Sequence, residues 1–147
     1  MPAGSFTLYN SAKLDIHEGT INLDTGGDTI LAILLTVGYT PVATHSTYAD
    51  VSANLVADGD YSDQVVTGQD LVETAGVVTF DANDVSYGNP VTITAKYIVL
   101  MKRTTGTKAA GDPLIGYMDL ETGGGSVSST NAPFQLAWNA SGIYTAT

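Results

Sequence analysis

The alternation of apolar and polar residues over residues 91–102 predicts a β-strand, since successive side chains of a strand point to opposite faces. One face is apolar throughout, and the other changes from polar to apolar at Ile98 and Leu100. The middle of this strand is therefore expected to be covered on both sides and to be central in its sheet. After a polar loop, residues 114–120 are expected to run back beside it as a second strand.

The rest of the pattern predicts one short helix and several more strands. Residues 9–19 are expected to form the helix, with Asn10 or Ser11 as its cap and Gly19 as its stop. Residues 29–37 are apolar on both faces, which predicts a second central strand. The other expected elements are a hairpin over 64–72 and 76–80, a polar segment at 81–90 with Tyr87 as its anchor, a flexible loop at 122–130, and closing strands at 133–138 and 143–147.

These elements favour an all-β fold of about eight strands: a two-layer antiparallel β-sandwich or jelly roll with one short N-terminal helix. Residues 1–7 are expected to be an N-terminal arm that is disordered on its own, and residues 8–147 a single β-sandwich domain. Residues 38–63 lack a regular pattern, apart from one helical turn expected near Tyr48. A connection of this length is typical of an interaction loop.

Composition and charge narrow the possible partners. The 147 residues suit one domain, and 16 glycines with only 14% charged residues fit an all-β chain. A net charge of -10, from 15 acidic and 5 basic side chains, argues against nucleic acid as a partner. The apolar run at 30–37 is too short to cross a bilayer, so no membrane partner is expected. Without cysteine there is neither a disulfide nor a thiol nucleophile.

The search for catalytic chemistry finds no nucleophile motif. His17 and His45 are the only histidines, and neither lies beside a serine or aspartate in a recognisable pattern, so we expect neither an enzyme nor a cofactor. Two groups of oxygen-bearing side chains could hold a divalent cation or be solvated turn residues: Asp58, Asp60 and Asp63 in one, and Asp81, Asn83 and Asp84 in the other.

Short runs distributed along nearly the whole chain carry a family resemblance. They are YNSAKL at 9–14, GTINLDT at 19–25, YTP at 39–41, DVSAN at 50–54, VTFDAND at 78–84, ITAKY at 93–97, LIGY at 114–117, SSTN at 128–131 and WNASGI at 138–143. Together they resemble a family of small structural proteins from the virions of tailed bacteriophages. The resemblance implies a virion component and brings no catalytic residues with it.

Our leading hypothesis is therefore a capsid decoration or cement protein that binds the outer shell and stabilises neighbouring capsomers. The resemblance implies the major capsid protein as partner, a homotrimer by analogy, and a place on the capsid surface of the virion after synthesis in the host cytoplasm. The expected contact residues lie in the N-terminal arm, the 38–63 loop and the 122–131 loop: Pro2, Phe6, Tyr39, Pro41, His45, Tyr48 and Val127.

Two other functions remain open at this stage. A tail, neck or fibre-associated module could bind a host-surface carbohydrate, with sugar rings stacked on Tyr39, Tyr48, Tyr61 and Tyr87. A hydrolase is the third possibility, but the sequence offers no pair of acid and base for it.

Overall fold

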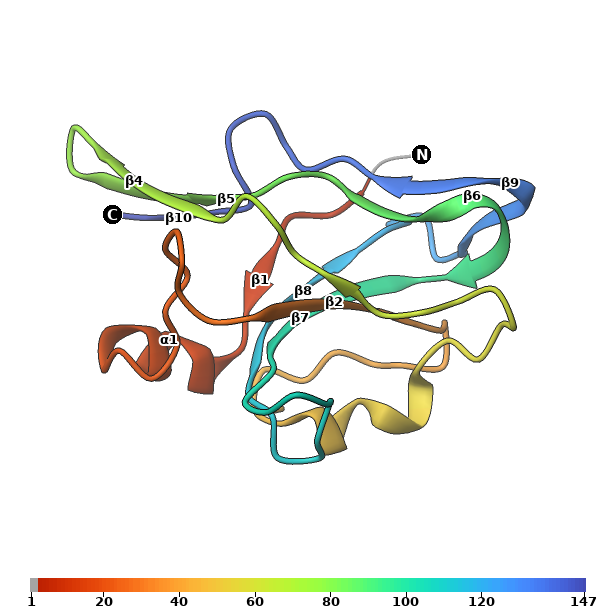
Figure 1. The fold of residues 1–147 in the computed structure, drawn as a ribbon, viewed down its shortest axis with the longest axis horizontal. Coiled ribbons are helices and arrows are strands. Elements are labelled where there is room, and N and C mark those ends of the chain that lie inside the picture. The colour runs from red at the N-terminus through yellow and green to blue at the C-terminus, as the bar shows by residue number, and fades with distance from the viewer. Residues whose placement is uncertain (1–2) are drawn as a thin grey trace.

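The computed structural model describes residues 3–147, which form an all-β sandwich with one short helix near the start of the chain (Figure 1). The prediction of an all-β sandwich with a short N-terminal helix is confirmed. The elements of these residues are β1 (Thr7–Leu8), α1 (Asn10–His17), β2 (Ile30–Leu35), the 3-10 turns η1 (Tyr48–Asp50) and η2 (Ser52–Asn54), β3 (Gln64–Val65), β4 (Asp70–Thr74), β5 (Val77–Asp81), β6 (Val85–Ala95), β7 (Tyr97–Lys102), β8 (Leu114–Asp119), β9 (Val127–Leu136) and β10 (Tyr144–Ala146).

A five-stranded antiparallel sheet, in the order β1-β8-β7-β2-β3, lies in the middle of the molecule. β2 pairs with β7 along its whole length, from Ile30 opposite Lys102 to Leu35 opposite Tyr97. Every residue of β2 is buried, because both faces of the sheet are covered. The predictions of a central strand at 29–37 and of a returning strand after residue 113 are confirmed.

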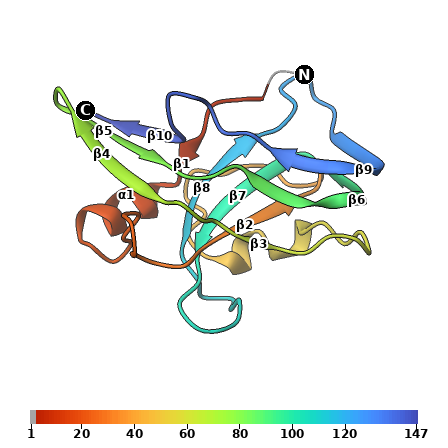
Figure 2. The ribbon, with the colours of Figure 1, turned by 45° about the horizontal axis from the view of Figure 1, so that its top comes forward.

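One face of this central sheet is covered by the ribbon of β6 and β9 and by the three-stranded sheet β10-β5-β4 (Figure 2). The larger hydrophobic core lies between these layers. Its members include Ala32 and Leu34 of β2, Ile98 and Leu100 of β7, Ile93 of β6, Phe80 of β5, and Phe134 and Leu136 of β9.

The opposite face is covered by irregular chain. Residues 36–55, which include η1 and η2, lie over Leu31, Ile33, Val99 and Met101 and form a second core. The 103–113 loop packs beside residues 36–55. Tyr48 N–H donates to the Asp112 carbonyl at 2.9 Å, and just after the loop Leu114 N–H donates to the Ser46 carbonyl, also at 2.9 Å. We call residues 36–55 and 103–113 together the outer layer.

The strand expected over residues 91–102 is in fact two strands, divided by a bend at Lys96. Before the bend, Ile93 faces the larger core, but after it the even-numbered Ile98 does so and Val99 faces the outer layer. The bend therefore shifts the alternation by one residue. The expectation of one continuous apolar face through residue 101 is wrong for this reason.

Four further expectations need correction. Residues 85–90, expected as a polar segment, begin strand β6, with Tyr87 buried. The flexible loop expected at 122–130 ends before Val127, where β9 begins. Helix α1 has neither Asn10 nor Ser11 as its cap: Tyr9 precedes it and makes no side-chain cap bond. Ten strands replace the expected eight in the described residues.

Other local predictions are confirmed. Gly19 has a φ of 76° just after α1, the left-handed conformation that stops a helix. The hairpin of β4 and β5 turns at Ala75 and Gly76, both with positive φ. The expected strand over 64–72 is interrupted, because its first residues form β3 and pair with β2 instead.

The described part of the N-terminal arm lies along the sheet. Gly4 N–H donates to the Asp119 carbonyl at 2.7 Å, and β1 pairs with β8. Phe6 packs over Gly116, where an added Cβ would meet its ring at 2.6 Å. Residues 4–7 thus form the edge of the domain, which differs from the expected free arm because backbone pairing and the Phe6 ring hold them.

Candidate interaction surface

The expected contact residues fall into two separate places. Tyr39, Pro41, His45 and Tyr48 all belong to the outer layer. Phe6 and Val127 pack instead against the larger core, across the central sheet from that layer. Pro2 lies outside the described residues. The structure thus brings four of the expected residues together and keeps Phe6 and Val127 apart from them.

A chain of hydrogen-bonded side chains fastens the outer layer to the central sheet. The Tyr9 hydroxyl lies 2.8 Å from the Tyr39 hydroxyl, which in turn lies 2.9 Å from His45 Nδ1. The Tyr117 ring packs on Tyr9 and the Tyr97 ring meets Tyr39 edge-on, with centroids 5.3 and 5.5 Å apart. Burial, with the hydrogen bond from Tyr39, raises the pKa of Tyr9 far above its usual range. Tyr39 is itself buried and so serves as an anchor rather than as a contact surface.

A carboxylate stiffens the segment after His45. Asp50 accepts hydrogen bonds from Ser46 N–H at 2.8 Å and Thr47 N–H at 3.0 Å, the latter as part of a capping box at the start of η1. These two backbone donors hold the pKa of Asp50 below its usual range. The turn therefore keeps its shape without help from a partner.

Tyr48 is engaged by a cation from the neighbouring loop. Lys108 Nζ lies 4.6 Å from the centroid of the Tyr48 ring and 2.5 Å from Asp63 Oδ2. Burial works to lower the pKa of Lys108, but the contacts with Asp63 and Tyr48 outweigh it and raise that pKa. Asp63 also accepts a hydrogen bond from the Tyr61 hydroxyl at 2.6 Å. These contacts fix the two loops against each other.

The outer layer leaves two aliphatic side chains in solvent. Val37 is 62% exposed and Val42 is 43% exposed, and Pro41 beside Val42 is half-buried. Asn10 N–H donates to the Ala43 carbonyl at 2.9 Å, so the start of α1 braces this segment. Val37 was expected to be the last residue of the central strand at 29–37, but β2 ends at Leu35 and leaves it exposed. Val42 was not among the expected contact residues, although an apolar residue in an otherwise polar loop is a signal for one.

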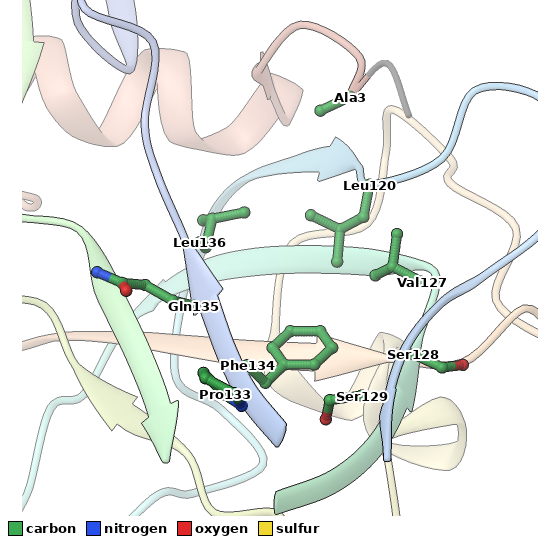
Figure 3. A pocket seen from close by; sticks show the side chains of 9 residues that line it. All are labelled: Ala3, Leu120, Val127, Ser128, Ser129, Pro133, Phe134, Gln135 and Leu136. Carbon is green, nitrogen blue, oxygen red and sulfur yellow. The ribbon is translucent and has the colours of Figure 1, made fainter. Parts of the chain in front are cut away.

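Val127 lines a cavity of about 250 Å³ on the other side of the central sheet (Figure 3). The side chains of Leu120, Val127, Phe134 and Leu136 gather around it, with Ala3 of the arm at its rim. The side chain of Val127 is half-buried against the core. This cavity is a gap between strand β9 and the arm, remote from the outer layer.

The first group of acidic residues does not converge on a common point. Asp58 Oδ2 accepts from Thr94 N–H and Asp60 Oδ2 from Thr92 N–H, each at 2.8 Å, while Asp63 holds Lys108. Asp58 and Asp60 thus accept hydrogen bonds from backbone N–H groups of β6, and Asp63 forms an ion pair with Lys108.

The second acidic group is likewise dispersed. Asp84 Oδ1 accepts from Trp138 N–H at 3.0 Å, and Asn83 Nδ2 donates to Thr67 Oγ1 at 3.2 Å. Asp81 bonds the next backbone N–H at 2.9 Å. Within residues 3–147, no three histidine or acidic side chains are arranged to hold a metal ion.

His17 Nδ1 lies 2.6 Å from the Lys13 carbonyl oxygen, and His45 Nδ1 lies 2.9 Å from the Tyr39 hydroxyl. In the described part of the chain, no helix has the length and apolar character needed to cross a membrane. Comparison with known proteins finds no matching family model, no matching curated protein and no matching solved structure.

Proposed function

We propose that the protein is a structural component of a bacteriophage virion, and specifically a capsid decoration or cement protein. In this proposal it binds the major capsid protein on the outside of the shell and stabilises neighbouring capsomers. The family resemblance of the sequence supports the virion assignment. The outer layer supplies the surface through which the protein docks.

The observation that carries the proposal is the construction of the outer layer. Its long irregular chain is fixed from below by Tyr9 and Tyr39 and from within by Asp50, yet it presents Val37 and Val42 to solvent. A loop that is already rigid loses little conformational entropy when it binds. Such a surface suits permanent attachment to a fixed partner.

The charge distribution supports a protein partner over packaged nucleic acid. Three of the five basic side chains are in ion pairs in the described structure: Lys96 with Asp119, Lys102 with Asp28, and Lys108 with Asp63. The 15 acidic side chains outnumber the 5 basic ones, and this excess of negative charge repels a phosphate backbone. A trimer at a symmetry axis belongs to this proposal by analogy with the resembled family.

The carbohydrate-binding alternative gains no support from the tyrosines on which it depended. Tyr39 and Tyr87 are buried, and the Tyr87 hydroxyl donates to the Ala32 carbonyl at 3.1 Å. Tyr61 stacks on Tyr87 and bonds Asp63, and Tyr48 is engaged by Lys108. These contacts occupy the four rings or hydroxyls that would have met a sugar.

The first experiment is to measure the copy number of this protein in purified particles by quantitative mass spectrometry, relative to the major shell protein. We expect a ratio near that of the shell protein. A ratio of a few per cent would refute decoration of the shell and move the protein to the neck, tail or fibres.

The docking surface is tested by adding purified protein to shells that lack it. Val42→Asp is expected to weaken binding at least tenfold, because it puts a charge into an apolar contact. Val65→Asp is the matched control, since Val65 is 48% exposed on β3 outside the outer layer. Equal binding by both variants would exclude the outer layer as the docking surface.

A further inference from the structure

The bend between β6 and β7 places a buried lysine against a carboxylate. Lys96 is only 5% exposed. Its Nζ lies 2.8 Å from Oδ1 and 3.0 Å from Oδ2 of Asp119, at the end of β8, and also donates to the Glu121 carbonyl. The amine therefore lies directly beside the carboxyl group of Asp119. This cluster is independent of the proposed docking surface.

Backbone hydrogen bonds hold both partners in this position. Lys96 N–H donates to the Leu35 carbonyl, and Leu120 N–H donates to the Lys96 carbonyl, both at 2.8 Å. The strand register puts Tyr97 directly opposite Asp119. Two groups that the fold holds side by side have a high effective concentration. The entropy cost of bringing them together has therefore already been met during folding.

The pair lies in a part of the structure that holds little water. Lys96 is removed from water, and the next carboxyl group, that of Glu121, is also buried, with Oε2 lacking a hydrogen-bond partner in the described structure. A buried ion pair carries a desolvation cost, and a reaction that turns both charged groups into one neutral amide removes that cost.

The backbone of Glu121 is placed to assist an attack. Its N–H donates to Asp119 Oδ1 at 2.9 Å, so it would stabilise negative charge that develops on that oxygen. Its carbonyl accepts from Lys96 Nζ and orients the amine. The Asp119 side chain is partly exposed, which gives a released water molecule a way out.

We propose that Lys96 and Asp119 join spontaneously in an intramolecular isopeptide bond after folding. Lys96 Nζ attacks Cγ of Asp119, a C–N bond forms, and the bond from Cγ to one carboxyl oxygen breaks. That oxygen leaves as water with two of the three ammonium protons, and the third proton stays on the amide nitrogen. The charges of the pair cancel, and no oxidant, metal or other reactant takes part.

The bond would tie the β6–β7 bend covalently to the end of β8. The chain has no cysteine and so no disulfide. Like a disulfide, the isopeptide bond would close a covalent loop, here between residues 96 and 119, and so restrict the conformations of the unfolded chain. The cross-linked protein is therefore expected to migrate faster than a linear variant in a denaturing gel.

The test is intact mass spectrometry of the purified full chain, followed by proteolysis and peptide mapping. We expect a mass lower by one water and a branched peptide joining Lys96 to Asp119. Asp119→Asn is expected to lose one ammonia instead, because the leaving group changes, and Lys96→Met is expected to keep its full mass. The wild-type measurement does not depend on whether either variant folds.

Two results would overturn the proposal. One is a wild-type chain of full mass with Lys96 and Asp119 in separate linear peptides. The other is a water loss that maps elsewhere, for example to a succinimide at the exposed Asp58 beside Gly59.

Discussion

Replacing Asp112 by alanine should loosen the outer layer more than any other single change to a charged side chain in the 103–113 loop. Asp112 is completely buried. Its Oδ1 accepts from Thr104 N–H at 3.1 Å and from the Thr104 hydroxyl at 2.5 Å, and its Oδ2 accepts from Ala109 N–H at 2.9 Å. The same residue offers its backbone carbonyl to Tyr48 N–H. The loop and residues 46–50 therefore depend on one side chain for their shape.

The expected cost follows from those three hydrogen bonds. A hydrogen bond to a charged group contributes about 1.5–3 kcal/mol. Thr104 and Ala109 are exposed, so water can replace the lost acceptor, and the sum is reduced accordingly. We expect Asp112→Ala to lower the free energy of unfolding by about 2–4 kcal/mol. Asp112→Asn should cost about half as much, because its amide keeps one oxygen but turns an NH₂ toward Ala109 N–H.

The effect should also depend on pH. Burial works to raise the pKa of Asp112, but the hydrogen bonds from Thr104 and Ala109, with the charge of Arg103, outweigh it and lower that pKa. A carboxyl group with a lowered folded pKa stabilises the fold above its unfolded pKa and loses this contribution as the pH falls through the folded value. The stability gap between wild type and Asp112→Asn should be constant near neutrality and shrink below about pH 4.

The assay is urea unfolding at a series of pH values, followed by circular dichroism, with Glu18→Gln as the control. Glu18 is exposed at the end of α1, so its variant should match the wild type within about 0.5 kcal/mol at neutral pH. A cost below about 1 kcal/mol for Asp112→Ala, or a gap to Asp112→Asn that stays unchanged down to pH 3, would refute the reasoning.

Three further substitutions probe the packing. Val99→Asp puts a charge into the fully buried second core and should cost several kcal/mol; a soluble variant with an unchanged melting temperature would contradict that placement. Gly116→Ala would bring a Cβ within 2.5 Å of a backbone oxygen of β1, so β1 should separate from β8 and its amide protons should exchange faster. The control Gly106→Ala, where an added Cβ has open space, should leave amide exchange in β1 unchanged. Tyr39→Phe removes two hydrogen bonds and should lower the unfolding free energy by about 1–2 kcal/mol, measured by urea titration; no change would mean that the Tyr39 hydroxyl does not hold the layer.

The central strands could be predicted because runs of consecutive apolar residues in the sequence indicate burial on both faces. Residues 30–35 are apolar at every position, and so short an apolar run favours a strand covered on both faces over a helix; β2 is indeed buried throughout. The bend at Lys96 could not be read in the same way. From Ile98 to Met101 every residue is apolar, so either parity of the alternation fits the sequence, and only the tertiary packing decides between them.

The first half of strand β9 was not predicted because of its composition, whereas its last residues belong to the closing strand expected at 133–138. Ser128 and Ser129 lie in a run typical of flexible loops, yet Ser129 Oγ donates to the Val91 carbonyl at 2.9 Å and accepts from Ile93 N–H at 3.3 Å. These bonds join residues far apart in sequence, so no local pattern reports them. The same limit applies to Tyr39, whose loop position suggested a contact role but whose hydroxyl pairs with Tyr9, 30 residues away.

The carboxylates of Asp58 and Asp60 affect whether neighbouring copies of the protein can pair through the edge of β6. A strand edge with free N–H groups is a template on which another chain can add by backbone pairing and begin to aggregate. Here the N–H groups of Thr92 and Thr94, on the edge of β6 away from β9, already have side-chain acceptors. A second copy that approaches this edge meets two negative charges and no vacant donor at these two positions. Many copies can therefore lie close together without joining through this edge of the sandwich.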